Sequence, residues 1–147
     1  MVARYEHNPI LTTRDIPPSQ PGWVVECVLN PGVFVFEDKI WMIVRVAERP
    51  AQVQGKVSFP VMREDGNLRI MEFDTHDPNL RLSDPRLVGY NGDTYLSTYS
   101  NLRLMCSRDG VNFSEPENIP SLLIGQGPLE TYGIEDCRVS FMEGKYH

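Results

Sequence analysis

The sequence predicts an all-β fold, and three observations lead to that prediction. The 147 residues include 12 prolines and 11 glycines, and both residue types favour the turns that join short strands. No long segment shows the apolar period of 3.6 that marks an amphipathic helix. The third observation is an internal repeat of hairpin-like segments, which indicates a fold assembled from similar β units. At this length the chain can form one domain with a sizeable core.

Three segments of the chain align with one another without gaps. They cover residues 30–44, 84–98 and 136–147, and their starts are 54 and 52 residues apart. In each segment, runs rich in Val, Phe, Ile, Tyr or Trp stand on both sides of a short polar turn. Such residues suit a pleated, half-buried surface, so each segment reads as strand, tight turn, strand.

The turns of the three hairpins are expected at equivalent places, Asp38-Lys39, Gly92-Asp93 and Gly144-Lys145. Two-residue turns of this kind need a positive φ. Further short strands are expected around the Asp-Gly pairs of residues 62–68 and 106–113. About four short strands in roughly 50 residues is typical of one β-propeller blade, so the chain is expected to hold about two and a half blades. A β-sandwich with accidental similarity between hairpins is the alternative.

The third hairpin is expected to be incomplete in this chain. Tyr146 and His147 fall inside its second strand, and a strand without its partners leaves backbone groups unpaired at an edge. β-Propellers typically close with about four to eight blades, which is more than the repeat supplies here. We therefore expect residues 1–147 to be one partial β-propeller domain, truncated at its C-terminus, and this part alone to be inactive.

Composition narrows the classes of partner. The net charge is −6 and the pI is about 5.0, which argues against nucleic acid and against anionic membranes as partners. A neutral sugar is compatible with this charge. Cys27, Cys106 and Cys137 are widely spaced, which predicts reduced thiols, no metal site and a cytoplasmic protein. The first residues lack the apolar core of a signal peptide, and no apolar run is long enough to cross a bilayer.

Five segments carry more specific information, and they follow one another in a fixed order. They cover residues 8–18, 29–33, 44–49, 107–113 and 130–139. The second contains Asn-Pro-Gly, the fourth contains Ser-Arg-Asp-Gly, and the last reads Glu-Thr-Tyr-Gly-Ile-Glu-Asp-Cys-Arg-Val. In this order they resemble the motifs of glycoside hydrolase family 130, the mannoside phosphorylases and β-mannosidases. The Cys of the last motif stands where the family most often has Pro.

The resemblance implies a five-bladed β-propeller and an enzyme that cleaves β-mannosidic linkages. It implies inverting phosphorolysis, which converts a β-mannoside oligosaccharide and inorganic phosphate into mannose 1-phosphate, with no cofactor. Two alternatives stay open: an inverting β-mannosidase that uses water, and a non-catalytic propeller that binds carbohydrate or protein. Both enzymatic reactions need a carboxylic acid that protonates the leaving oxygen and a nucleophile on the opposite face of the sugar.

Two aspartates compete for the role of that acid. Asp136 lies in the fuller motif, with Glu130, Gly133 and Glu135 before it, and the resemblance implies that it is the catalytic acid. These negative neighbours are expected to raise the pKa of Asp136, as an acid working near neutral pH requires. Asp84 opens the second repeat and is the rival, or else a substrate-binding residue. Its alternative role is structural, since an Asp at a turn can accept hydrogen bonds from its own backbone.

Six further residues are candidates for binding substrate or phosphate: Asn30, Arg45, Arg103, Glu130, Tyr132 and Arg138. Asn30 holds the same repeat position as the two aspartates, so all three are expected at one end of the propeller axis. Arg45 and Arg138 could hold phosphate or paired hydroxyls through the planar guanidinium. Arg103 could face the pocket or extend to the surface, and Tyr132 could stack on a sugar or belong to the core.

Overall fold

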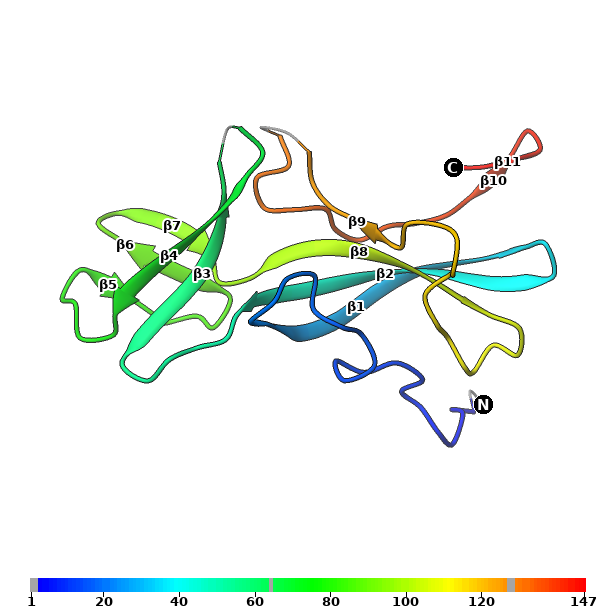
Figure 1. Ribbon diagram of the computed structural model, residues 1–147, viewed down its shortest axis with the longest axis horizontal. Coiled ribbons are helices and arrows are strands. Elements are labelled where there is room, and N and C mark those ends of the chain that lie inside the picture. Colours follow the sequence, from blue (N-terminus) through cyan, green and yellow to red (C-terminus); the bar gives the residue numbers. More distant parts are fainter. Residues whose placement is uncertain (1–2, 64, 127–128) are drawn as a thin grey trace.

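The computed structural model describes residues 3–63, 65–126 and 129–147. Within these ranges the regular elements are β-strands (Figure 1), which confirms the predicted all-β class. In chain order the strands are β1 (Trp23–Phe36), β2 (Lys39–Pro50), β3 (Lys56–Met62), β4 (Leu68–Asp74), β5 (Leu80–Arg81), β6 (Leu87–Tyr90), β7 (Asp93–Leu96), β8 (Tyr99–Ser107), β9 (Leu122–Leu123), β10 (Phe141–Met142) and β11 (Lys145–Tyr146). None of the described residues belongs to a helix long and apolar enough to span a membrane.

The described strands form four sheets. The largest has the order β1-β2-β8-β9, and the others are β3-β4, β5-β6-β7 and β10-β11. β8 pairs with β2, from Tyr99 opposite Glu48 to Ser107 opposite Ile40, although β3 to β7 lie between them in the sequence. The strand after the second hairpin thus completes the sheet of the first, so one unit of the repeat does not coincide with one sheet. Among the described residues the sheets do not close into a ring, and the number of blades stays a prediction.

The three predicted hairpins are present, and their turns lie one residue earlier than predicted. Glu37-Asp38 joins β1 to β2, Asn91-Gly92 joins β6 to β7, and Glu143-Gly144 joins β10 to β11. All six turn residues have positive φ, between 48° and 93°. This is the backbone of a type I′ turn, which needs positive φ at both central residues. The Gly or Asp therefore fills the second place in the turn and not the first.

The two faces of β2 have different roles, because side chains alternate along a strand. On one face Met42, Val44 and Val46 are buried and form the main hydrophobic core with Ile16 and Met105. Each buried aliphatic side chain of this kind stabilises the fold by about 1.5–3 kcal/mol. The segment before β1 thus covers this face, and the opposite face of β2 carries Arg45 among apolar side chains such as Trp41 and Ala47.

A second core joins the β3-β4 hairpin to the β5-β6-β7 sheet. Phe59 of β3 is fully buried and packs with Val57, Leu80 and Val88. Its ring centroid lies 5.3 Å from that of Tyr95 on β7. The second hairpin of the repeat is held by this core, at the end of the molecule opposite to the third hairpin (Figure 1).

The third hairpin packs against the first. A Cβ at Gly32 of β1 would lie 3.1 Å from the carbonyl oxygen of Cys137 and 3.2 Å from Cγ2 of Val139, so the lack of a side chain allows this close approach. The Tyr146 hydroxyl donates to the carbonyl of Val35 near the end of β1. These contacts bring the segment before β10 alongside β1.

Candidate functional site

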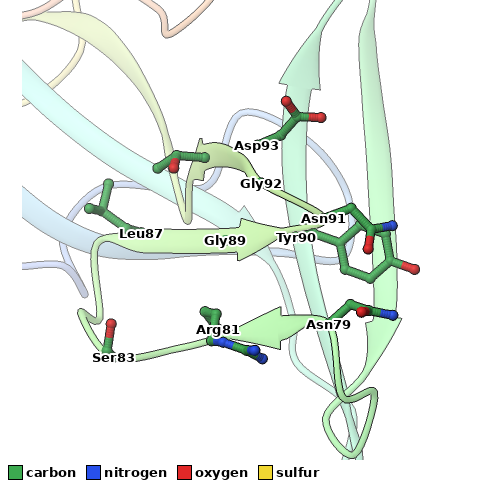
Figure 2. A pocket seen from close by; sticks show the side chains of 10 residues that line it. Asn79, Arg81, Ser83, Leu87, Gly89, Tyr90, Asn91, Gly92 and Asp93 are labelled. Carbon is green, nitrogen blue, oxygen red and sulfur yellow. The ribbon is translucent and has the colours of Figure 1, made fainter.

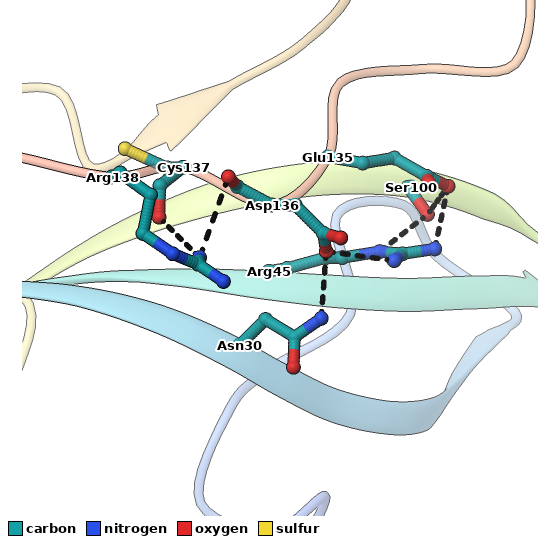
Figure 3. A network of polar contacts seen from close by, with 7 residues as sticks. All are labelled: Asn30, Arg45, Ser100, Glu135, Asp136, Cys137 and Arg138. Carbon is teal, nitrogen blue, oxygen red and sulfur yellow. Dashed lines mark hydrogen bonds and ion pairs between the residues drawn. The ribbon is translucent and has the colours of Figure 1, made fainter.

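Three of the predicted site residues meet at one place (Figure 3). Asn30 Nδ2 donates to Asp136 Oδ1 over 2.7 Å, and Arg45 Nη1 donates to the same oxygen over 3.0 Å. Asn30 belongs to β1 and Arg45 to β2, while Asp136 lies in the segment before β10. The side chain of Asp136 is 51% exposed, so it is accessible to a ligand.

Asn30 reaches Asp136 because the pairing of β1 with β2 is interrupted at this point. The ladder runs without a shift from Cys27 to Leu29 and resumes at Gly32, so the two residues between Leu29 and Gly32 bulge. Asn30 has a φ of 36°, close to the left-handed region that Asn adopts more readily than most residues. A bulge turns a side chain away from its regular direction, and here it directs the Asn30 amide to the carboxylate.

Gly133 fixes the segment that carries Asp136 onto β8. It forms a parallel bridge with Ser100, and Ile134 N donates to the Ser100 carbonyl over 3.1 Å. Gly133 has a φ of 90°, and a Cβ at this position would overlap the Ser100 carbonyl oxygen. Only glycine combines this φ with so close a backbone contact. The glycine of the motif thus sets the residues that follow it beside Arg45.

Arg45 is at the centre of the cluster. Its Nη2 donates to Glu135 Oε1 over 2.5 Å and its Nε donates to Ser100 Oγ over 3.3 Å. Ser100 Oγ in turn donates to Glu135 Oε1 over 2.9 Å. Glu135 and Ser100 were not among the predicted site residues. The position of Glu135 next to Asp136 was the signal for the first, whereas no sequence signal reveals that β8 brings Ser100 beside β2.

The pKa of Asp136 lies below its usual value. The first cause is the hydrogen bond from the Asn30 amide and the second is that from the Arg45 guanidinium. The charges of Arg45 and Arg138 act in the same direction. The prediction that negative neighbours raise this pKa is therefore wrong for this arrangement, because direct donors to the carboxylate outweigh a neighbouring carboxylate that is itself paired.

A cavity of about 480 Å³ lies beside the cluster. Arg45 and Glu135 border it on one side, and Pro85, Arg86 and Thr98 of the second repeat border it on another. The two repeats thus contribute to one concave site. The cavity offers guanidinium and carboxylate groups together with apolar surface, a mixture that suits a small polar ligand such as a sugar.

Asp84 faces its own segment instead of the cluster. Its Oδ1 accepts hydrogen bonds from the Nε and the backbone N–H of Arg86, over 3.0 and 2.9 Å, and its Oδ2 accepts one from Nη2 over 2.7 Å. These bonds lower the pKa of Asp84 to about 2. Asp84 thus makes the contacts expected of its alternative, structural role, in which it accepts hydrogen bonds from its own turn. The expected convergence of the three repeat positions is found for Asn30 and Asp136 and not for Asp84.

Arg103 is buried on the other face of the sheet. Its guanidinium donates to Asn101 Oδ1 over 3.1 Å and to the Pro17 carbonyl over 3.2 Å, and it lies 3.6 Å from the buried carboxylate of Glu48. Both expected locations, the pocket and the surface, are therefore wrong. The reason is the alternation of the strand, since Arg103 stands three positions after Ser100 and points to the opposite side.

Three other predicted residues have contacts of their own. Glu130 Oε2 accepts the backbone N–H of Gln126 over 2.6 Å. Tyr132 is exposed and borders a separate groove of about 310 Å³. Arg138 Nη1 donates to the Cys137 carbonyl over 2.8 Å, and its charge acts on Asp136 as described above. A role in binding substrate or phosphate stays a prediction for all three.

A further open concavity of about 510 Å³ lies over the β5-β6-β7 sheet (Figure 2), with Asn79, Arg81 and Tyr90 among its lining residues. None of the predicted site residues belongs to its lining. Over the described part of the chain, no group of three or more His, Cys, Asp and Glu side chains is arranged to hold a metal ion. The cluster around Asp136 is therefore the best candidate for a functional site.

Comparison with known proteins gives relatives for the whole chain. No family model matches the sequence. A β-1,2-mannobiose phosphorylase from Listeria innocua is 31% identical over an alignment of 152 positions, gaps included, that covers 99% of this chain and 42% of the phosphorylase. The solved structure of β-1,2-mannobiose phosphorylase from Listeria innocua in complex with β-1,2-mannobiose matches with a TM-score of 0.86 at 32% identity, over 98% of this chain and 42% of that one. The chain thus spans less than half the length of these relatives, and it is homologous in sequence and fold to part of a β-1,2-mannobiose phosphorylase.

Proposed function

We propose that this chain is the part of a glycoside hydrolase family 130 enzyme that carries the catalytic acid. The enzyme cleaves β-mannosidic linkages by inverting phosphorolysis, with inorganic phosphate as co-substrate, and releases mannose 1-phosphate. Similarity to the Listeria innocua phosphorylase over nearly the whole chain supports this reaction class. That phosphorylase was solved with β-1,2-mannobiose, so a β-1,2-linked mannoside is the first substrate to test. In this proposal the complete enzyme is a five-bladed β-propeller.

The observation that carries the proposal is the surroundings of Asp136. A half-exposed carboxylate accepts hydrogen bonds from an amide and a guanidinium next to a cavity. In the proposed reaction Asp136 gives its proton to the oxygen of the leaving sugar, while phosphate attacks the anomeric carbon from the opposite face. Asn30 and Arg45 hold the carboxylate in place, and both carry donors that suit sugar hydroxyls.

Asp136 must carry a proton before it can act as an acid. Its two donors favour the charged form, which lowers its pKa. A phosphate dianion that binds near Arg45 adds negative charge beside Asp136 and competes for the guanidinium. Both effects raise the pKa of Asp136 toward the range that an acid needs. In this proposal the binding of phosphate therefore prepares the acid for proton transfer.

Hydrolysis is the competing reaction, and the contacts of Glu135 weigh against Glu135 as its base. An inverting hydrolase needs a second carboxylate that is free to activate water. Glu135 is the carboxylate nearest to Asp136 in the sequence, and it is held by Arg45 and Ser100. This engagement argues against Glu135 as that base, and the non-catalytic propeller is the other competing function.

The test uses the full-length protein that contains this chain. It is incubated with β-1,2-mannobiose, with and without inorganic phosphate, and the products are separated by anion-exchange chromatography. We expect mannose 1-phosphate and mannose only when phosphate is present, and β-1,4-mannobiose serves as the matched control for linkage. Free mannose formed at the same rate without phosphate would identify a hydrolase. Binding of β-1,2-mannobiose without turnover in either condition would favour the non-catalytic function.

A further inference from the structure

Arg45 is held by three hydrogen bonds to three different side chains. Its Nε donates to Ser100 Oγ, its Nη2 to Glu135 Oε1 and its Nη1 to Asp136 Oδ1, over 3.3, 2.5 and 3.0 Å (Figure 3). The Arg45 side chain is only 18% exposed. Because a guanidinium is planar and rigid, fixing two of its nitrogens also fixes the direction of the third.

Ser100 and Glu135 close a ring of hydrogen bonds around one edge of the guanidinium. Ser100 Oγ accepts from Arg45 and donates its own proton to Glu135 Oε1 over 2.9 Å. Ser100 is buried on β8, and Gly133 fixes the segment of Glu135 to the backbone of the same residue. The ring therefore stands on two strands and one docked segment, which makes it a rigid support.

Glu135 and Asp136 both pair with the single positive charge of Arg45. The guanidinium forms an ion pair with Glu135 through Nη2 and another with Asp136 through Nη1. The two carboxylates repel each other, and this repulsion offsets part of the attraction that each one feels from the shared cation. The groups around Asp136 are Asn30 from β1 and Arg45 from β2, which donate to it, Arg138, whose charge lowers its pKa, and Glu135, which shares Arg45 with it.

We infer that Glu135 and Ser100 are positioning residues that hold Arg45 and, through it, set how readily Asp136 carries a proton. This inference rests on the proposed function for its effect on activity. The negative charge of Glu135 offsets part of the effect that the Arg45 charge has on Asp136. Ser100 keeps the guanidinium in the plane where it can donate to both carboxylates. Neither side chain needs to contact the sugar.

The isosteric substitution Glu135→Gln removes this charge and leaves Arg45 paired with Asp136 alone. Asp136 then holds its proton less strongly, because the negative charge of Glu135 no longer opposes the ionised form of Asp136. An enzyme that depends on a protonated acid loses activity as pH rises through the pKa of that acid. We expect the alkaline limb of the pH profile of kcat to move to lower pH by about half a pH unit, with roughly threefold lower activity on that limb.

The matched control is Glu26→Gln. Glu26 borders the same cavity, and its carboxylate pairs with Arg49 Nε over 2.7 Å instead of Arg45. The Glu26→Gln substitution removes one negative charge from the same cavity, as Glu135→Gln does. We expect the alkaline limb of the pH profile of kcat to stay in place in Glu26→Gln. A purely structural role of Glu135 would lower kcat and the melting temperature without moving the limb, and that result would overturn the inference.

A second measurement does not depend on turnover. Aspartate carboxyl carbons in the full-length protein are labelled with ¹³C, and the Asp136 signal is assigned by its loss in Asp136→Asn. We expect its titration midpoint to be lower in Glu135→Gln than in the unsubstituted protein and unchanged in Glu26→Gln. An unchanged or higher midpoint in Glu135→Gln overturns the inference even in an active enzyme. A lower midpoint supports it even if no mannose 1-phosphate forms, in which case only the proposed function fails.

Discussion

Asp136 and Asp84 open equivalent segments of the repeat, but their carboxylates have different partners. Asp136 accepts from Asn30 and Arg45, which come from other strands. Asp84 binds the side chain and backbone of Arg86, two residues further along. Asp136 has a φ of 49°, a conformation that Asp tolerates better than most residues. The same Asp-x-Arg pattern thus yields one carboxylate that contacts other strands and one that caps its own turn.

This difference predicts opposite outcomes for two matched substitutions. In the full-length protein, Asp136→Asn should lower kcat for phosphorolysis by about 10²- to 10⁴-fold, the usual contribution of a general acid. Asp84→Asn should leave kcat within a few fold, because its carboxylate contacts only its own segment. Initial rates of mannose 1-phosphate release measure both, and melting temperatures check that each variant is folded. An active Asp136→Asn beside an inactive, folded Asp84→Asn would reverse the assignment.

The sequence predicted those site residues that lie in the repeat or in a recognisable motif. The repeat and the motifs placed Asn30, Arg45 and Asp136 together, and they meet in the structure. Arg103 was misjudged because its direction depends on which face of β8 it occupies, and that follows from the pairing of β8 with β2. Ser100 was missed for the same reason. Side-chain partners from distant strands depend on which strands pair and in which register, and no hairpin turn joins β2 to β8.

At the scale of elements, the docking of the motif segment on β8 depends on Gly133. Its φ is 90°, and any Cβ would overlap the Ser100 carbonyl oxygen. Gly133→Ala must therefore push the segment away from β8 and carry Asp136 with it. A displacement of about 1 Å at a catalytic group can cost roughly 100-fold in rate. We expect a loss of that size in phosphorolysis, measured as kcat in the full-length protein.

The matched control for this substitution is Gly92→Ala in the second hairpin. Gly92 has a φ of 93°, and a Cβ there would meet no atom within 4 Å. Both variants place alanine in the left-handed region at a cost of about 1–2 kcal/mol, but only Gly133→Ala adds the backbone overlap. Equal kcat values in the two variants would show that the close contact with Ser100 does not position the acid.

The hairpins could be predicted from the sequence, but the pairing between distant strands could not. The three hairpins could be predicted because their strands and turns are contiguous, and the type I′ turns have the 54- and 52-residue spacings of the repeat. The pairing of β2 with β8 could not, because β3 to β7 intervene. The buried polar network of Glu48, Asn101 and Arg103 depends on that same pairing. Non-local pairing was therefore the main part of the fold that the sequence left open.

At the scale of the whole molecule, the first and third hairpins expose apolar side chains. Val35 on β1 is 60% exposed and Phe141 on β10 is 63% exposed, and Val33 and Met142 are exposed beside them on the same strands. Contiguous exposed apolar surface on a soluble protein usually marks a place where further protein packs. Because the chain spans 42% of its relatives, we propose that further chain of the same protein covers these hairpins.

This proposal predicts different behaviour for residues 1–147 alone and for the full-length protein. The isolated part should bind the dye 8-anilinonaphthalene-1-sulfonate, because its hairpins expose apolar side chains, and it should release no mannose 1-phosphate. The double substitution Val35→Ser and Phe141→Ser should lower the dye fluorescence. Val53→Ser is the matched control, since Val53 is 59% exposed outside both hairpins and should contribute little. Phosphorolysis by residues 1–147 alone, without dye binding, would contradict the proposal and mean that the Asp136 cluster is complete without further chain.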